Sequence, residues 1–165
     1  RPGRERAALM AIVDEDSAQV RFPPPLIVFG ALFLGLAVDR SLGLPMIEVA
    51  WLRPVGVVCG ALGAAILGSG LIGFIKAGTN PEPWKKDTQL VTSGLYRFTR
   101  NPMYLGMVMV QLGIALFALN IGALASVPLA VLLVDRFVIA REERHLTATF
   151  GSAYRAYCGR VRSWL

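Results

Sequence analysis

The sequence predicts an all-α integral membrane protein with about four transmembrane helices and an amphipathic C-terminal helix at the membrane interface. Hydrophobic residues make up 55% of the 165 residues and charged residues only 17%, which is too apolar for an ordinary soluble domain. Long stretches carry no charge, and the positive charges gather in every second connecting segment. The length suits one domain, which we expect over residues 23–165 after an N-terminal tail, residues 1–22.

The first two spans are expected at roughly residues 24–39 and 55–75. Successive prolines at positions 23–25 can start a helix sharply, but only 13 uncharged residues follow before Asp39. The second run holds 21 residues without a charge, which is the length that a bilayer requires. The second span is therefore of full length, whereas the first is short and needs its flanking residues to cross.

A third uncharged stretch, residues 103–134, is long enough for two short helices. At a rise of about 1.5 Å per residue, its 32 residues exceed a hydrocarbon core of about 30 Å. Asn120 and Gly122 supply turn residues near its middle. We therefore expect a helical hairpin with spans at roughly 102–119 and 121–140.

Small residues recur in the second span at every fourth position, namely Gly56, Gly60, Ala64 and Gly68. Such a stripe lets another helix approach closely, because lipid offers no hydrophobic drive for helix association. We expect a helix-packing face here, and the stripe leaves a homodimer open.

The positive charges predict the orientation of the chain. Four lie in the N-terminal tail, five between residues 76 and 101 and six between 136 and 162, so 15 of the 17 share one side of the membrane if both termini are cytoplasmic. Cytoplasmic segments usually carry the excess of Lys and Arg. The sequence thus predicts a multi-pass protein with both termini in the cytoplasm.

The same residue counts argue against a nucleic-acid partner and against a metal site. The net charge of +6 is explained by orientation, so it no longer favours a nucleic-acid partner. The chain has two distant cysteines, Cys59 and Cys158, and one histidine, which is too few for the usual metal sites.

Polar and aromatic residues crowd around the expected start of the third span. Asn101 followed by Pro102 predicts a helix start, with Asn as the capping residue and Pro in the first helical position. Tyr96, Arg100 and Tyr104 lie close to it in sequence. A helix N-terminus flanked by arginine suits a carboxylate or a phosphate.

The C-terminal segment, residues 141–165, opens on two carboxylates, Glu142 and Glu143. They can pair with Arg141 and Arg144 in a solvated charge cluster, or bind a cationic, hydroxyl-rich ligand at the mouth of the bundle. Both interpretations are open. After Gly151, one set of residues falls at helical spacing opposite Arg155 and Arg162 and predicts an interfacial helix: Tyr154, Tyr157, Cys158, Val161 and Trp164.

Residues 90–106 read LVTSGLYRFTRNPMYLG and resemble the signature of the isoprenylcysteine carboxyl methyltransferase family, roughly L-V-T-x-G-x-Y-x-x-x-R-(H/N)-P-x-Y-x-G. The C-terminal half is similar to the family as well, and the likeness covers about half of the chain. Related phospholipid methyltransferases share the arginine-proline and double-glutamate elements. The elements that follow in the family's order are Glu142-Glu143, Leu146, Phe150-Gly151, Tyr154, Tyr157 and Arg160-Val161.

The resemblance implies methyl transfer from S-adenosylmethionine to a lipophilic small-molecule or lipidated acceptor at the cytoplasmic membrane face, with S-adenosylhomocysteine as the product. A carboxylate is the first acceptor to expect. It also implies two catalytic residues, Arg100 to position a carboxylate and Tyr104 to line the pocket. The implied cofactor contacts are Leu90, Val91, Gly94, Tyr96, Asn101, Pro102, Tyr104, Glu142 and Glu143.

Two positions depart from the family. Its frequent histidine before the proline is Asn101 here, a side chain that donates hydrogen bonds but does not titrate near neutral pH. Eukaryotic members place a substrate-binding arginine four residues before the cofactor glutamate, and that position is Val138. Arg136, two residues away, is therefore the candidate for substrate binding.

The chemistry fits residues that bind and align. A carboxylate acceptor is already a nucleophile, so methyl transfer to it depends on alignment rather than on a general base. An amine acceptor must lose a proton, for which Tyr104 or a glutamate is the nearest candidate. Three alternatives remain: a phospholipid N-methyltransferase, an NADPH-dependent membrane sterol or enone reductase with similar C-terminal helices, and a small transporter or scaffold.

Overall fold

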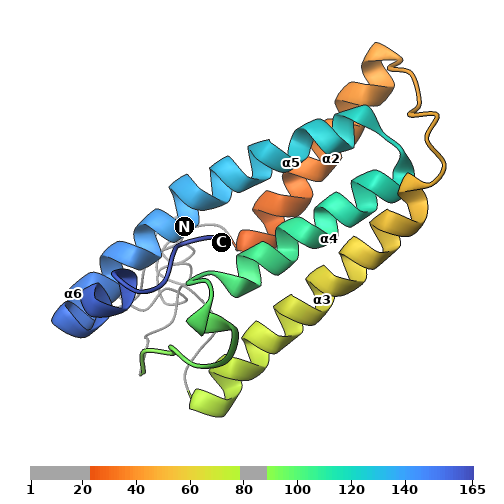
Figure 1. The fold of residues 1–165 in the computed structure, drawn as a ribbon. Coiled ribbons are helices and arrows are strands. Elements are labelled where there is room, and N and C mark those ends of the chain that lie inside the picture. Colours follow the sequence, from red (N-terminus) through yellow and green to blue (C-terminus); the bar gives the residue numbers. More distant parts are fainter. Residues whose placement is uncertain (1–22, 79–88) are drawn as a thin grey trace, which may run out of the picture.

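The computed structural model describes residues 23–78 and 89–165, and within them the regular elements are all helices that run roughly along one axis (Figure 1). The predicted tail, residues 1–22, and Lys85 and Lys86 lie outside the described residues. The predicted all-helical class is confirmed. The elements are α2 (Pro24–Leu42), α3 (Leu52–Ala77), the 3-10 helix η1 (Gly94–Arg97), α4 (Pro102–Ala118), α5 (Ile121–Val134), the π-helical turn η2 (Asp135–Ile139) and α6 (Ala140–Cys158).

Three of these stretches are long and apolar enough to cross a membrane: Pro24–Leu42, Leu52–Ala77 and the continuous helical stretch Ile121–Cys158. The fourth, α4, is a shorter apolar helix. Large hydrophobic side chains on the outer faces of α2 and α3 are exposed, among them Phe33 (68%) and Leu62 (54%). An outer surface this apolar on helices of this length is what a bilayer covers, as expected for an integral membrane protein.

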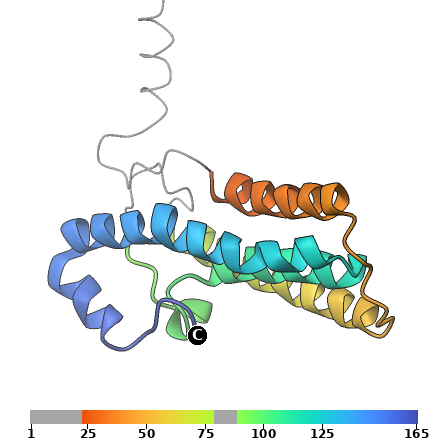
Figure 2. The ribbon, with the colours of Figure 1, turned by 90° about the horizontal axis from the view of Figure 1, so that it is seen from above.

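The helix that contains the fourth expected span is longer than that span. We expected a boundary near residue 140, but α5 continues through η2 into α6 without a break. The chain turns instead at Gly151, whose φ of 53° and ψ of −119° are not helical. Glycine adopts a positive φ without the steric penalty that a side chain brings. The last part of α6 consequently turns back toward the bundle (Figure 2).

Helices α3 and α4 pack backbone against backbone through glycines. A Cβ added at Gly63 would lie 2.7 Å from the Val110 nitrogen, and one added at Gly113 would lie 2.6 Å from the Gly60 nitrogen. Removing side chains at such positions is how membrane helices come this close. The buried glycines of α3 are seven residues apart: Gly56, Gly63 and Gly70.

This spacing corrects the predicted stripe. Gly56 and Gly60 do face α4, but Ala64 is exposed and Gly68 has open space around it. The fourfold spacing drifts around the helix, whereas a spacing of seven stays on one face. Because the face packs on α4 of the same chain, it gives a homodimer no support.

The second helix pair, α2 with α5, is closed at the turn before α5. Asn120 caps α5 by accepting a 2.8 Å hydrogen bond from the Ala123 amide. The Asp39 carboxylate accepts from the Asn120 side chain at 2.7 Å and from the Gly122 amide at 3.0 Å. The predicted turn at Asn120 and Gly122 is confirmed, and Asp39, which ends the first uncharged run, holds it to α2.

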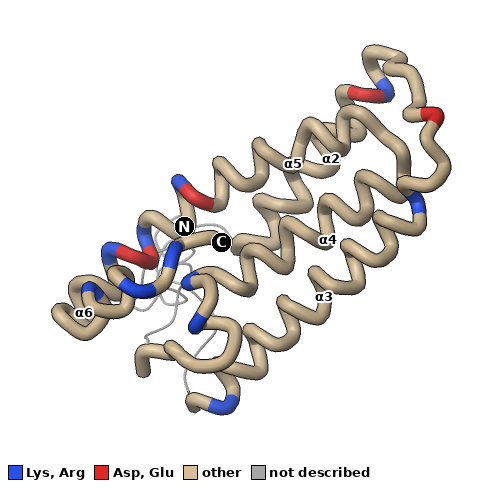
Figure 3. Tube along the Cα trace, viewed as in Figure 1, with Lys and Arg blue, Asp and Glu red and all other residues tan. Residues whose placement is uncertain are grey.

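Positive charge is concentrated at one end of the bundle (Figure 3). The end of α3, η1, the loop before α4 and α6 all carry Lys or Arg there, whereas Arg40 of α2 and Arg53 of α3 lie at the other end of the bundle. The described helices thus sort the charges as the sequence predicted. We call this end, with Lys76, Arg97, Arg100, Arg141, Arg144 and Arg155, the basic end.

Candidate active site

The candidate site lies at the basic end, where the loop before α4 and the chain after Cys158 meet the first turns of α4 and α6. We call residues 159–165 the C-terminal tail. Most of the predicted site residues lie on these segments, which are far apart in sequence. Their hydrogen bonds show how the fold brings the segments together.

The first contact joins α4 to α6. Tyr104, in the first turn of α4, donates a 2.6 Å hydrogen bond to Oε1 of Glu142, in the first turn of α6. Tyr104 is only 7% exposed, and its ring packs in a core cluster with Val28, Val134 and Ile139. The phenol group is thereby fixed, and the carboxylate that it holds has a defined place.

The second contact is an ion pair between Glu143, which follows Glu142 in the chain, and Arg100, which lies four residues before Tyr104. Arg100 donates from Nε at 3.1 Å and from Nη2 at 2.6 Å to Oε1 of Glu143. Its Nη1 donates to the Val161 carbonyl at 2.6 Å. Burial alone would lower the pKa of Arg100, but the hydrogen bond and charge of Glu143 outweigh it and raise this pKa. The described partner of Glu143 is thus Arg100 and not an arginine of its own helix, and ligand binding by the two glutamates stays a prediction.

Tyr96 forms the floor of the site from η1. It is 6% exposed and packs edge-on against Phe74 of α3, with ring centroids 5.4 Å apart. Burial, the charge of Glu142 and the neighbouring Tyr157 raise the pKa of the Tyr96 hydroxyl. The Tyr96 hydroxyl therefore keeps its proton and lies within reach of the charge of Glu142.

The C-terminal tail runs beside the loop that precedes α4. The Arg100 amide donates to the Arg162 carbonyl at 2.9 Å, and Thr99 donates from Oγ1 to the Ser163 carbonyl at 3.1 Å. The Asn101 side chain donates to the same carbonyl at 2.9 Å and to Ser163 Oγ at 3.0 Å. The loop residues that carry the motif are thus held by the end of the chain.

This arrangement corrects two predictions. Asn101 occupies the capping position of α4, but its side chain does not cap; its own amide donates to Thr99 Oγ1 at 3.2 Å. The expected interfacial helix ends at Cys158, so Val161 and Trp164 lie on the tail rather than on a helix face. Trp164 packs against the core cluster and donates from Nε1 to Asp135 at 3.2 Å.

Sequence reasoning missed the residues that hold the tail. Ser163 and Asp135 had no assigned role, and Tyr157, taken as part of an apolar face, donates a 2.6 Å hydrogen bond to the Tyr96 carbonyl. One signal was available, because Gly159 is a typical helix stop and marks the end of α6. Nothing in the sequence indicates the direction in which the tail then folds.

The remaining predicted residues fall into two groups. Val91 and Pro102 are buried, and Leu90 is partly buried, so they shape the loop beneath the site. Arg136 is exposed on η2, and the structure does not bring it to Glu142 or Glu143 by any described contact. Val138, the position of the arginine in the resembling family, is fully buried in the core cluster.

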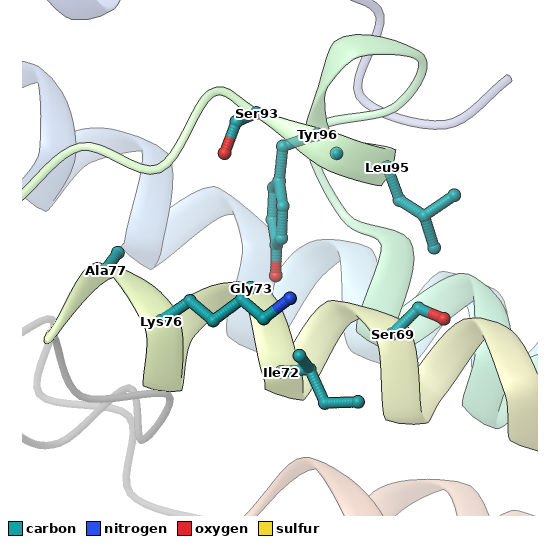
Figure 4. Close-up of a pocket in the computed structure, with 9 residues that line it drawn as sticks. Ser69, Ile72, Gly73, Lys76, Ala77, Ser93, Leu95 and Tyr96 are labelled. Carbon is teal, nitrogen blue, oxygen red and sulfur yellow. The ribbon is translucent and has the colours of Figure 1, made fainter.

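A cavity of about 390 Å³ opens beside the site, between the end of α3 and η1 (Figure 4). Among the predicted site residues, Gly94 and Tyr96 line it. Its polar lining residues include Ser69 and Lys76 of α3 and Ser93 of the loop. A volume of this size is in the range of small-molecule sites.

Comparison with known proteins places these elements in a family. The sequence profile of the phospholipid methyltransferase family matches residues 52–153, more than half of the chain. A protein of Haemophilus influenzae described as uncharacterized is 40% identical over 63 residues, which is 38% of this chain and 100% of that protein. The profile match extends from α3 to beyond Gly151 and includes Arg100, Tyr104 and both glutamates. The chain therefore belongs to the phospholipid methyltransferase family, a family of membrane methyltransferases.

Proposed function

We propose that the protein transfers a methyl group from S-adenosylmethionine to a lipophilic acceptor at the basic end of the bundle. One observation carries the proposal: two adjacent carboxylates of α6 reach two motif residues at the start of α4, Glu142 to Tyr104 and Glu143 to Arg100. The family match favours methyl transfer over the reductase and transporter alternatives. By the usual excess of positive charge inside, this end and both termini face the cytoplasm.

The residues present fit the cofactor by their chemistry. S-adenosylmethionine carries a sulfonium, an ammonium, a carboxylate and ribose hydroxyls, and it supplies the methyl group that is transferred. Glu142 offers negative charge and acceptor oxygens beside Tyr104, which suits the cationic and hydroxyl groups.

The chain's contribution to catalysis is positioning. Tyr104 fixes the Glu142 carboxylate, and the pair between Arg100 and Glu143 fixes α6 against the start of α4. Holding two reactants in line can lower a barrier by about 7–11 kcal/mol, so a site of this kind needs rigidity more than a catalytic triad. Each contact joins a partly buried glutamate to a residue packed against the bundle, which supplies that rigidity.

The acceptor that we put first is a lipophilic carboxylate. The Tyr96 hydroxyl holds its proton tightly, Tyr104 donates to Glu142, and Glu143 is paired with Arg100. A site with these partners favours an acceptor that is nucleophilic without losing a proton. Phe98, 71% exposed next to Arg97, presents an apolar surface beside a charge, as membrane-interface residues do.

An amine of a phospholipid is the second candidate, and a separate observation favours it. The 2.6 Å hydrogen bond between Tyr104 and Glu142 forms a pair that could take a proton from an ammonium group, with Glu142 as the final acceptor. The family description also names phospholipids.

One experiment separates the two acceptors. The purified protein is incubated with S-adenosylmethionine labelled in the methyl group and with membrane lipids or a prenylcysteine, and the lipid fraction is then treated with mild base. A carboxylate acceptor gives a methyl ester that releases labelled methanol, whereas an amine keeps its label. No label in the lipid fraction under any condition would contradict the proposed activity.

A further inference from the structure

The cavity between α3 and η1 is distinct from the cluster of Tyr104, Glu142 and Glu143. Neither glutamate nor Tyr104 is among its described lining residues. Its walls come from the last turns of α3 and from the loop before η1: Ser69, Ile72, Gly73, Lys76, Ser93 and Tyr96 are among its lining residues. The cavity therefore needs its own explanation.

The charge on the described lining of the cavity is positive. Its described lining includes the ammonium group of Lys76 and the hydroxyls of Ser69 and Ser93, and no Asp or Glu among the residues that line it. A cation with two hydroxyl donors is a typical set for a carboxylate or a phosphate. The chemistry of the cavity thus favours an anionic oxygen group.

The direction of Lys76 supports this assignment. A lysine in the last turn of a helix interacts favourably with the helix dipole, which would account for the residue type alone. Figure 4 shows more: the side chain runs back along α3 beneath Tyr96, and Ser93 lies on the opposite wall. The ammonium group is therefore presented to the cavity and not beyond the end of the helix.

The cavity also borders the lipid-facing surface of α3. Ile72 lines the cavity and is 50% exposed. It belongs to α3, and only 17% of the apolar stretch of this helix is buried inside the protein. Gly73 leaves room beneath Tyr96, because a Cβ added there would lie 3.6 Å from Cε2 of that ring. A ligand here can keep its polar group at the basic end while its chain stays in the bilayer.

We propose that this cavity binds the anionic headgroup, phosphate or carboxylate, of the lipid acceptor, with Lys76 as the specificity-determining cation. This inference rests on the proposed function. Tyr96 lines the cavity, and the charge of Glu142 acts on its hydroxyl, so the cavity lies near the proposed cofactor residues. A headgroup held by Lys76 and Ser93 places the lipid next to the residues that are proposed to hold the cofactor.

The test measures binding without relying on turnover. The full-length protein in a neutral detergent is titrated by calorimetry with short-chain phosphatidic acid, with the uncharged diacylglycerol of the same chain length, with inorganic phosphate and, separately, with S-adenosylhomocysteine. The variants are Lys76→Gln and Gly73→Ala, whose added methyl group narrows the cavity at an ordinary contact distance. The matched control is Arg53→Gln, an exposed cation at the other end of α3.

We expect phosphatidic acid to bind and diacylglycerol not to. Lys76→Gln should weaken the binding of phosphatidic acid by about fivefold to tenfold, which is the usual order for losing one charge-assisted contact. Arg53→Gln should leave this binding unchanged. The affinity for S-adenosylhomocysteine should stay unchanged. Loss of that affinity in Lys76→Gln would assign the cavity to the cofactor and overturn the proposal, as would equal phosphatidic acid binding in Lys76→Gln and wild type.

The two sources of the anion are separated in the same titrations. If inorganic phosphate binds as tightly as phosphatidic acid, the cavity is a site for free anions and the lipid assignment is wrong. If S-adenosylhomocysteine fails to bind while phosphatidic acid binds through Lys76, the proposed function fails and the cavity assignment stands.

Discussion

Tyr104 donates its phenolic proton to Glu142, 38 residues later in the chain, across a distance of 2.6 Å. The two residues come from the two halves of the family motif, and each lies in the first turn of its helix. The contact therefore fixes the position of α6 relative to α4 at the one end of the bundle where charges gather.

Removing this hydrogen bond should reduce methyl transfer more than it reduces stability. Tyr104→Phe keeps the ring in the core cluster but removes one hydrogen bond to Glu142, so we expect stability to fall by about 1 kcal/mol. The rate of label transfer to membrane lipids should fall about tenfold, because the carboxylate is held less firmly in place. Ser41→Ala, which removes a hydroxyl at the other end of the bundle, is the control. Equal loss of activity in both variants would contradict the role of Tyr104.

The pair between Arg100 and Glu143 should show strong coupling in a double-mutant cycle. Arg100→Gln should lower the free energy of unfolding by about 2–3 kcal/mol and Glu143→Gln by less, because Arg100 also donates to the Val161 carbonyl. We expect a coupling energy of about 1–2 kcal/mol from thermal unfolding of the two single variants and the double variant. Arg97→Gln, an exposed arginine of η1, should have little effect. Additive losses would show that the ion pair contributes nothing.

Stability should decline above pH 10 because of Tyr157. Burial is the largest cause that raises the pKa of its hydroxyl from 10.0 to about 12, so the folded state holds the proton more tightly than the unfolded state. This contribution is complete below pH 10 and is lost as the pH rises from 10 through 12, to the extent of about 1–3 kcal/mol. Tyr157→Phe cannot ionise, so its unfolding temperature should fall less steeply over this range. Parallel curves for the variant and wild type would contradict the assignment.

The glycines of α3 provide a matched pair of substitutions with opposite outcomes. Gly63→Ala places a Cβ 2.7 Å from the Val110 nitrogen, so α3 and α4 must separate and we expect a loss of about 2 kcal/mol or more. Gly68→Ala meets nothing within 4 Å and gains up to about 1 kcal/mol from helix propensity. Thermal unfolding in detergent measures both changes. If both substitutions destabilise the protein equally, the assignment of Gly63 to the face that packs on α4 is wrong.

The sequence predicts the helices well because their signals are local. Long uncharged runs, the prolines at the start of α2 and the turn at Asn120 each need only neighbouring residues to be interpreted. The glycine face of α3 was predicted only in part. Gly60 and Gly68 fit a spacing of four residues, and only the contacts with the partner helix decide between a spacing of four and one of seven.

The site was harder to predict because its contacts are long-range. The motif identifies Arg100, Tyr104, Glu142 and Glu143, and the structure brings them together in two pairs. The C-terminal tail was missed, because hydrogen bonds from Thr99 and Asn101 to Ser163 join residues more than 60 positions apart. An amphipathic pattern near the end of the chain fits a helix and a folded-back tail equally well.

The affinity for S-adenosylhomocysteine in Glu142→Gln tests the central claim most directly. The amide is close in shape to the carboxylate but carries no charge, and Glu48→Gln, an exposed carboxylate in the loop before α3, is the matched control. Calorimetry should show binding to wild type and to Glu48→Gln with the same affinity, and at least about tenfold weaker binding to Glu142→Gln. Equal affinity in all three proteins, or no binding to any of them, would contradict a cofactor site built on Glu142.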